Sequence, residues 1–391
     1  MQRMLIAGGG YADIPLIQSA KKRGYYVITT GNRPDDLGHF YSDEFHAVDF
    51  SDCEAIYKLA RNLNVSAICP CCNDFSALSA AYAAEKLKLP GHDPYQTAII
   101  IHHKDKYRRF ARAHDIPTPK AVGGGSTKEV LSGIESLSFP VIIKPVDLSG
   151  GKGITVVNTK TEIPPAITKA LNISKAKRVV VEEFITGTRH GFSTFIRDKK
   201  VGFYFSDNEH YYLNPYMVSA ASTPAFVPEA VENKLCLELE RIASLLSLKD
   251  GILHVQYILK DGKPYIIEIC RRAPGDLYIN LVEHSTGVDY PGWIVRAFAG
   301  KGCGDIKHLE TTGFYVRHCV MGAKPGIIHD VVFDDSIKKN IIDKFMWWKK
   351  GDVVEDFMTA KFGIVFLKFD TAEEMKSKAD ILNELIVPRI E

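Results

Sequence analysis

The first 95 residues alternate short, apolar, β-rich runs with longer stretches of helical character. The runs predict strands at residues 4–7, 25–30 and 66–69, and the stretches that follow them predict helices at 14–23, 54–63 and 75–87. Such alternation is typical of a parallel sheet whose strands are joined by crossover helices. We therefore predict a Rossmann-like domain over residues 1–95.

The pattern changes after this region. A helix predicted over 94–115 is ended by Ile116-Pro117-Thr118-Pro119, because proline disfavours helix at its own position and at the one before it. A polar, glycine-rich link at 123–126 leads into a compact unit with strands at 141–144, 154–158 and 178–183, the last of them edge-like. Residues 206–227 indicate a long irregular loop, which in a compact domain is usually functional or mobile.

Helical spacing returns in the next segment, where apolar positions 231, 235, 239, 242 and 246 predict an amphipathic helix over 229–246. Asp261-Gly262 provides turn chemistry between strands at 254–259 and 264–269, which predicts a hairpin. After residue 300 we expect further strands and a charged helix at 372–385. The fold class is therefore α/β, with an α+β central part and a small C-terminal subdomain.

Composition mainly excludes classes of protein. The 49 Lys and Arg residues nearly balance the 47 Asp and Glu residues, and this disfavours a nucleic-acid binder. No apolar run approaches the roughly 18 residues of a membrane helix, and the N-terminus runs directly into a strand, without room for a signal peptide. Eight cysteines without framework spacing indicate reduced thiols and a cytoplasmic location.

Two suggestive motifs do not complete a known site. Gly8-Gly9-Gly10 follows the first predicted strand, but Asp13 stands where a dinucleotide fingerprint needs its third glycine. Cys69-Pro70-Cys71-Cys72 is too compressed for two pairs of zinc ligands. Asp74, just after it, suits either a ligand site at the strand end or a helix N-cap.

Candidate chemistry begins with a lysine inside an apolar strand. Lys144 follows Ile142-Ile143, and a buried unpaired charge is costly, so Lys144 needs a partner. The glycine-rich segment 149–153 comes a few residues later, and its backbone amides can close over phosphates. The alternative is a purely structural hairpin. Carboxylates end the next strand at Glu182 and Glu183, where they serve either an adenine amino group or a solvated strand end.

The predicted hairpin adds oxygen ligands. Gln256 lies on one strand and Glu268 on the other, and Mg²⁺ typically takes one or two carboxylates together with substrate phosphates. Arg272 follows shortly after and can neutralise charge on a transferring phosphoryl group. Lys104, upstream, would by itself be a solvated helix lysine.

In this order and at these separations, the motifs resemble the ATP-grasp superfamily. Within this superfamily, the motifs most resemble those of L-amino acid ligases, carbamoyl-phosphate synthetase and biotin carboxylase. The resemblance covers essentially the whole chain, and it implies an ATP-grasp domain at 96–300 with a lid subdomain at about 118–185 and a central subdomain at about 186–300. The preceding domain would be 1–95 and the C-terminal subdomain 301–391.

The resemblance also implies roles for individual residues. Lys104, chosen over Lys106 for its spacing to Pro117, and Lys144 would contact the nucleotide phosphates, with Arg272 and Lys144 acting in catalysis. Gln256 and Glu268 would hold magnesium. The rest of the nucleotide site would be Ser149, Gly150, Gly151, Lys152, Gly153, Glu182, Glu183, Phe184, Ile185 and His190, and the substrate would meet Arg272, Gly275, Asp276 and Arg317.

The chain departs from the family pattern near the metal site. Cys270 stands where relatives usually have Asn, Arg271 where they have Pro, and Gln256 where Glu is commoner. With one anionic ligand in the pair, the pattern leaves the number of magnesium ions open. Asp276 and Glu283 are the nearby carboxylates that would compensate.

The function implied by the resemblance is ATP-dependent ligation of a carboxylate to an amine through an acyl phosphate, with an amino acid as substrate. ATP and Mg²⁺, for which Mn²⁺ can substitute, would be the cofactors. The partners would be small molecules, with no nucleic acid and no membrane; homodimers are common in the family. Two alternatives stay open: phosphorylation of another small carboxylate or bicarbonate, as in carboxylases and purine synthesis, and a nucleotide-binding regulatory protein without turnover.

Overall fold

The N-terminal unit of the computed structural model, which describes residues 2–391, is built on a parallel sheet with strand order β3-β2-β1-β4. Its first strand is buried from Met4 to Ala7, as expected for a strand covered on both faces. The predicted parallel sheet with crossover helices is confirmed, and β3 is an addition. The elements are β1 (Arg3–Ala7), α1 (Ile14–Lys22), β2 (Tyr26–Thr30), β3 (Glu44–His46), α2 (Cys53–Asn62), β4 (Ala67–Pro70) and α3 (Asp74–Leu87).

The helix predicted at 94–115 is two helices, α4 (Tyr95–His102) and α5 (Lys104–Ala113). His103 between them is extended, with φ −101° and ψ 114°. The amide of Lys104 donates to the carbonyl of Val146 at 3.1 Å instead of continuing the helix. This tertiary contact, which no local pattern encodes, starts α5 at Lys104.

The lid unit is an antiparallel sheet with strand order β5-β8-β6-β7. Two expectations are wrong here. The link at 123–126 is partly strand, and Gly123 fits there because a Cβ would lie 2.6 Å from that of Asp105. The strand predicted as edge-like is β8, which is central and buried from Val179 to Glu182. The elements are β5 (Ala121–Gly124), α6 (Thr127–Leu131), β6 (Val141–Pro145), β7 (Thr155–Val157), α7 (Ile163–Ile173) and β8 (Val179–Glu183).

An eight-stranded antiparallel sheet follows, with strand order β13-β12-β9-β10-β11-β14-β18-β16. The predicted hairpin is confirmed, with Asp261 and Gly262 at φ 50° and 71° in the turn. The loop expected at 206–227 is shorter, because β10 continues to His210 and β11 lies inside the range. The strands are β9 (Thr188–Arg197), β10 (Lys200–His210), β11 (Ala220–Thr223), β12 (Gly251–Lys260), β13 (Lys263–Cys270), β14 (Phe314–Val320), β16 (Ile341–Met346) and β18 (Gly363–Phe369).

Alternation along the strands gives this sheet two different faces. Phe192, Val255 and Tyr257 pack against α8 (Glu229–Leu245), the predicted amphipathic helix. Phe195 and Ile252 on the other face belong to the core that includes α9 (Tyr278–Thr286) and α10 (Tyr290–Phe298). Further along the strands, this second face turns polar.

The C-terminal unit adds the three-stranded sheet β17-β15-β19. The helix expected at 372–385 is divided into α12 (Ala372–Ala379) and α13 (Leu382–Leu385). The boundary at residue 300 stays a prediction, since β14, β16 and β18 lie beyond it yet belong to the large sheet. The remaining elements are β15 (Gly326–Phe333), α11 (Asp335–Lys338), β17 (Val353–Val354) and β19 (Ile386–Ile390).

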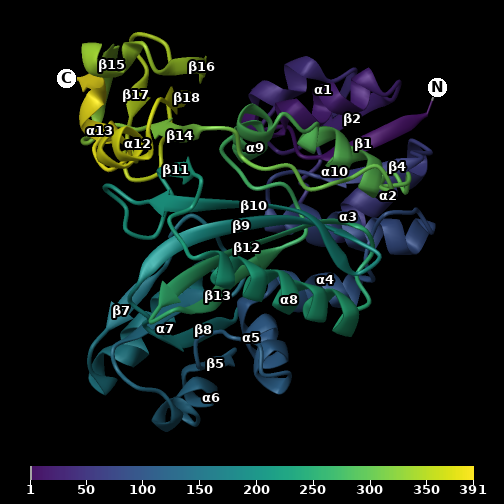
Figure 1. Ribbon diagram of the computed structural model, residues 1–391. Helices are drawn as coiled ribbons and strands as arrows, with labels where there is room; N and C mark the ends of the chain where they lie inside the picture. Colours follow the sequence, from purple (N-terminus) through teal and green to yellow (C-terminus); the bar gives the residue numbers. More distant parts are fainter. Residues whose placement is uncertain (1) are drawn as a thin grey trace.

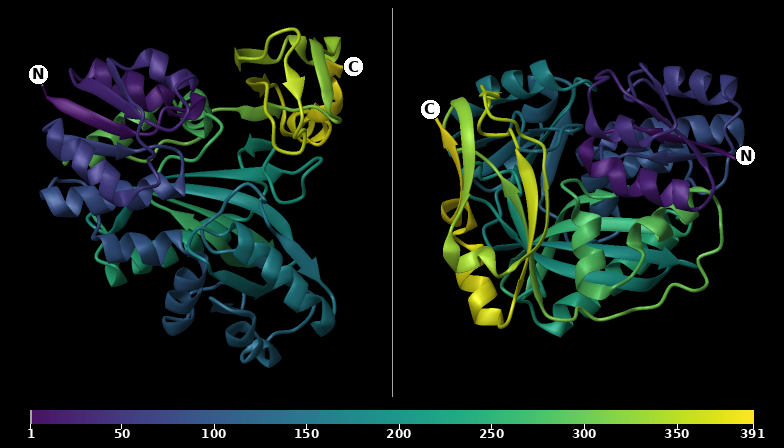
Figure 2. Two further views of the ribbon diagram at one scale, coloured as in Figure 1. Left: turned by 180° about the vertical axis from the view of Figure 1, so that it is seen from behind. Right: turned by 90° about the horizontal axis from the view of Figure 1, so that it is seen from above.

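The units surround the large sheet. The N-terminal and C-terminal units lie on opposite sides at the top of Figure 1, and the lid lies at the bottom. The view from above in Figure 2 shows the same separation of the two terminal units. Within residues 2–391, no helix has the length and apolar character needed to span a membrane. The parallel sheet, the antiparallel sheets and their helices confirm the predicted α/β class.

Arg271, an unusual residue at its position, has a structural role. Its Nε donates to Asp93 at 2.8 Å, and its other nitrogens donate to the carbonyls of Ile252 and Lys249, each at 2.7 Å. Both members of the ion pair are buried. Arg271 therefore anchors the end of β13 to the segment before α4.

We predict that Arg271→Met lowers the free energy of unfolding by about 3–5 kcal/mol, because Asp93 would keep a buried charge without its cation. Chemical denaturation measures the loss. The double variant Arg271→Met/Asp93→Asn should recover much of it. A loss below about 1 kcal/mol in the single variant would contradict a structural ion pair.

Candidate active site

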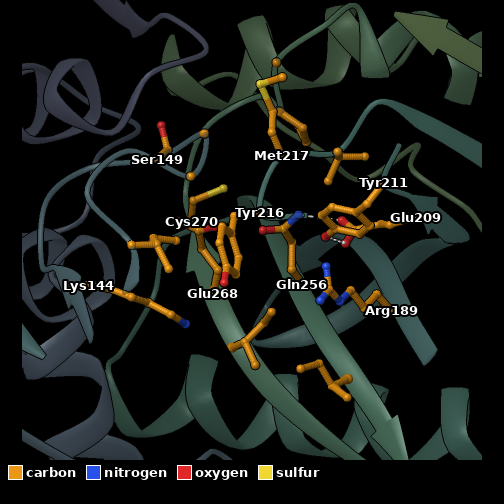
Figure 3. Close-up of a pocket in the computed structure, with 18 of the residues that line it drawn as sticks. Lys144, Ser149, Arg189, Glu209, Tyr211, Tyr216, Met217, Gln256, Glu268 and Cys270 are labelled. Atoms are coloured by element: carbon orange, nitrogen blue, oxygen red, sulfur yellow. Dashed lines mark hydrogen bonds between the residues drawn. The ribbon is translucent and has the colours of Figure 1, made fainter. Parts of the chain in front are cut away.

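A cavity of about 320 Å³ lies where the lid, the large sheet and the two terminal units meet. Figure 3 shows part of its lining. Most residues predicted from the sequence line it: Lys104, Lys144, Ser149, Gly150, Gly151, Glu182, Glu183, Phe184, Ile185, Gln256, Glu268, Arg272, Gly275, Asp276 and Arg317. Lys152, Gly153 and His190 do not. The roles given to all these residues stay predictions.

The floor of the cavity is the polar end of one face of the large sheet. Register places Glu268, Gln256, Gly191 and Asp207 in one row across β13, β12, β9 and β10. Directly opposed residues share a face, as do residues two apart along a strand. The same face therefore also presents Arg189, His254, Ile258, Glu209 and Arg317, all of which line the cavity.

Alternation also explains why His190 lies elsewhere. Arg189 faces the cavity, so its neighbour faces α8, where the His190 ring stacks on Tyr257 with centroids 5.1 Å apart. Nε2 of His190 lies 2.7 Å from Oγ1 of Thr188. Arg189 instead donates to the carbonyl of Pro215 at 2.5 Å.

The lysine predicted to need a partner has one. Nζ of Lys144 lies 2.8 Å from Oε2 of Glu182, and Arg108 lies 2.9 Å from Oε1 of the same carboxylate. Burial disfavours the charged form of Glu182, but Arg108 and Lys144 outweigh burial and lower its pKa. Burial lowers the pKa of Lys144, and Glu182 offsets only part of this effect. An anionic ligand near Lys144 would further favour the ammonium.

Lys104 reaches the same cavity from α5. Its Nζ lies 3.0 Å from Oε1 of Glu268 and 2.9 Å from the carbonyl oxygen of Leu148. Burial alone would lower the pKa of Lys104, but the carboxylates of Glu268 and Asp74 raise it above the usual range. Two lysines from different units therefore point into one space.

The glycine-rich loop connects β6 to β7 in the lid and lines the cavity with Ser149, Gly150 and Gly151. Gly150, Gly151 and Gly153 have φ of 68°, 78° and 70°, a region that glycine adopts without strain. A Cβ on Gly151 would lie 3.0 Å from that of Tyr216, so the loop lies against the segment that follows β10. Lys152 is exposed. The backbone of this loop, more than its lysine, faces the cavity.

The segment after β8 joins the lid to the large sheet. The amides of Glu183 and Phe184 donate to the carbonyls of Lys120 and Pro140, each at 3.0 Å. The Glu183 carboxylate accepts from the amide of Ser138 at 3.0 Å. Within the described residues 2–391, the amide of Ile185 has no hydrogen-bond partner. Ile185 is thus the residue of this segment with a free donor beside the cavity.

The predicted metal ligands face each other across the β12–β13 hairpin, with Gln256 paired to Glu268. An amide oxygen and a carboxylate suit Mg²⁺, which completes its shell with water and substrate phosphates. Cys270 cannot stand in for the usual Asn: its thiol donates to the carbonyl of Arg272, and burial raises its pKa to about 12. A neutral thiol is a poor ligand for this hard cation.

A carboxylate beside Gln256, that of Glu209, is absent from the residues predicted from the sequence. Glu209 on β10 lines the cavity, accepts from the Gln256 amide, and accepts from Tyr211 at 2.6 Å. The sequence offered Asp276 and Glu283 as carboxylates that would compensate for Gln256. Asp276 is paired with Lys361 and Arg317, and Glu283 does not line the cavity. The signal that could have found Glu209 is its spacing of two from Asp207 on a strand.

Arg272 is held by the N-terminal unit. Its Nε and Nη2 lie 3.0 and 3.1 Å from the two oxygens of Asp74, and His102 lies 2.9 Å from Oδ1 of the same carboxylate. Burial opposes the charge on Asp74, but Arg272 and His102 outweigh it and hold the pKa of Asp74 well below its usual range. Asp74 therefore orients Arg272 across the boundary between two units.

Asp276 organises the far end of the cavity. Lys361 lies 2.7 Å from both of its oxygens, Tyr11 donates to it at 2.6 Å, and Arg317 lies 3.4 Å away. Asp276 and Leu277 have positive φ of 58° and 54°, which is uncommon away from glycine. Two cations, Lys361 and Arg317, therefore hold one carboxylate at this end of the cavity. Lys361 is a second residue that the sequence analysis missed.

Comparisons with known proteins agree on the fold. Residues 103–276 match the family model for phosphoribosylglycinamide synthetase, ATP-grasp (A) domain. The fold resembles that of L-amino acid ligase from Bacillus licheniformis, with TM-score 0.80 and 18% identity over 100% of this chain and 99% of that one. It also resembles the biotin carboxylase domain dimer of 2-oxoglutarate carboxylase from Hydrogenobacter thermophilus, which was solved with MgADP and bicarbonate. For this structure the TM-score is 0.78 and the identity 16%, over 100% of this chain and 91% of that one.

One curated relative is the carbamoyl phosphate synthase large chain of Clostridium acetobutylicum, 21% identical over 314 residues. The match covers 76% of this chain and 28% of the relative, so the chain spans little more than a quarter of that protein. Residues 103–276 thus match an ATP-grasp domain, in agreement with the resemblance seen in the sequence. Proteins of the ATP-grasp family include ATP-dependent ligases that form C–N bonds.

The Glu283 side chain, which lies outside the cavity, should make the stability of the protein depend on pH. Burial, with help from Asp289, raises the pKa of its carboxyl to about 7. The native state therefore holds this proton between the ordinary pKa of 4.5 and about pH 7, and stability falls as the pH rises through that window. We predict that Glu283→Gln melts at a higher temperature than the wild type at pH 8, with the difference closing toward pH 5. A difference independent of pH would contradict this.

Proposed function

We propose that the protein is an ATP- and magnesium-dependent ligase that joins a carboxylate to an amine and releases ADP. The single observation that carries the proposal is the convergence of Lys104, Lys144, Glu268 and Arg272 on one cavity from three separate segments, α5, β6 and the end of β13. Two lysines suit phosphates, a carboxylate opposite an amide suits magnesium, and an arginine suits a transferring phosphoryl group.

The nucleotide would lie between the lid and the large sheet. Its phosphates would replace the carboxylates that now hold Lys104 and Lys144, under the glycine-rich loop. The adenine would contact the segment Glu183–Ile185, where the free amide of Ile185 provides a donor. Magnesium, or manganese in its place, would bind Glu268 and Gln256 and would neutralise charge on the phosphates. The related biotin carboxylase domain was solved with MgADP, which supports this assignment.

The proposed reaction has two steps. A carboxylate oxygen of the first substrate attacks the γ-phosphorus of ATP, the bond to the β–γ bridging oxygen breaks, and ADP leaves. The amine of the second substrate then attacks the acyl carbon, the bond to the phosphate oxygen breaks, and one amine proton passes to solvent. Arg272, fixed by Asp74, would stabilise the transferring phosphoryl group, so this chain's part is mainly positioning and charge.

An amino acid is the substrate that the cavity supports best. Arg317 and Lys361 suit a substrate carboxylate, since arginine can bind one with two hydrogen bonds. The acidic Asp207 lies on the same sheet face, and its Oδ1 has no hydrogen-bond partner within residues 2–391, which suits an ammonium group. Resemblance to an L-amino acid ligase over the full chain supports this choice. A homodimer and a cytoplasmic location stay expectations from the family and the cysteines.

A second candidate is a nucleotide-binding protein without turnover, and Cys270 favours it by removing one usual metal ligand. A third is phosphorylation of bicarbonate or another small carboxylate, which the bicarbonate bound in the related carboxylase favours. These three candidate functions are distinguished by measuring ADP release with amino acids, supplied singly and in pairs, and in a separate reaction with bicarbonate. Dependence on two amino acids supports the ligase, and dependence on one carboxylate supports the third candidate. ATP binding without ADP release under any condition supports the second.

For the ligase we predict that Lys144→Ala and Glu268→Gln each lower the rate of ADP formation by about 100-fold or more. Both variants remove charge that the reacting phosphates need while leaving the core intact. Lys152→Ala is the matched control, because Lys152 is exposed and its loop acts through backbone amides. Near-normal turnover in Glu268→Gln would refute the metal assignment, and normal ATP affinity in Lys144→Ala would refute the phosphate assignment.

A further inference from the structure

Gln256 and Glu209 lie on strands that are not neighbours. Gln256 is on β12 and Glu209 on β10, with β9 between them. The β9 residue opposite Gln256 is Gly191, which has no side chain. A Cβ there would lie 2.4 Å from Oδ2 of Asp207, so the position is closed to larger residues. The glycine opens a gap through which two long side chains meet across about 10 Å of sheet.

The contact fixes the direction of the Gln256 amide. Nε2 of Gln256 donates to Oε1 of Glu209, whose Oε2 accepts from Tyr211 at 2.6 Å. The ionised carboxylate of Glu209 only accepts hydrogen bonds, and the amide accordingly presents its NH₂ group to it. Its oxygen is then free for the opposite side, where Glu268 lies. Figure 3 shows Gln256 between Glu268 and Glu209.

We propose that Glu209 is a positioning residue for magnesium: it holds the Gln256 amide with its oxygen toward the metal and supplies the negative charge that Gln256 lacks. The two side chains would act together: Gln256 would contact the metal, and Glu209, which contacts Gln256 and not the metal, would carry the negative charge. Groups that orient metal ligands typically change affinity by about 10- to 100-fold when altered. The inference rests on the proposed function, which places magnesium at Gln256 and Glu268.

The proposal predicts a specific pattern for exchanging the two side chains. Glu209→Gln removes the charge and leaves the Gln256 amide free to turn. Gln256→Glu places two carboxylates at hydrogen-bond distance, where they repel. The double variant Glu209→Gln/Gln256→Glu restores one carboxylate and one amide in contact, with the charge moved next to the metal.

The experiment measures Mn²⁺ affinity by electron paramagnetic resonance with a non-hydrolysable ATP analogue present, and melting temperature without metal. We expect Mn²⁺ affinity to fall about 10-fold in Glu209→Gln and to return to within about 3-fold of wild type in the double variant. We expect the melting temperature to fall in Gln256→Glu and to recover in the double variant. Glu283→Gln, which removes a carboxylate outside the cavity, should bind Mn²⁺ like the wild type.

Two results would overturn the inference: wild-type Mn²⁺ affinity in Glu209→Gln, or weak binding that the exchange does not restore. Glu268→Gln is measured in parallel to separate this inference from the proposed function. If Glu268→Gln binds Mn²⁺ as tightly as the wild type, the metal site itself is misplaced and both fall. If Glu268→Gln is weakened and Glu209→Gln is not, only the role of Glu209 is wrong.

Discussion

The cavity depends on one constraint: cations removed from water must be paired with anions. Here each partner comes from a different part of the chain. Lys144 of the lid is held by Glu182, Lys104 of α5 by Glu268, and Arg272 by Asp74 of the N-terminal unit. Removing one partner of such a pair is far more costly than losing a surface ion pair. The pair of Arg272 and Asp74 therefore joins the end of β13 to the N-terminal unit, whereas the pair of Lys144 and Glu182 lies within the lid.

The same pairs account for the proposed activity. A polyanionic nucleotide would compete with Glu182 and Glu268 for the two lysines, and this would free one carboxylate for the adenine side and the other for magnesium. The three residues that depart from the family pattern near the metal site are compatible with this account. Arg271 serves the framework through Asp93, Cys270 is a buried thiol, and Gln256 gains a carboxylate in Glu209.

Local pattern predicted most of the elements and the order of the motifs, because apolar spacing and turn residues act over a few positions. The hairpin carrying Gln256 and Glu268 is an example, since Asp261-Gly262 sets its turn. The features that local pattern did not predict are contacts between distant segments. Asp74 meets Arg272 across 198 positions and Lys361 meets Asp276 across 85, and the break at His103 depends on a carbonyl in the lid. Glu209 was hidden by a strand that had been interpreted as loop.

The most direct test of the central claim follows oxygen from the substrate. Amino acids labelled with ¹⁸O in the carboxylate would be incubated with the protein and Mg-ATP, and the released phosphate would be analysed by mass spectrometry. Attack of the carboxylate on ATP predicts one ¹⁸O atom in each phosphate released with ADP. Phosphate without label, released together with ADP and a joined product, would contradict phosphoryl transfer to the carboxylate in this cavity.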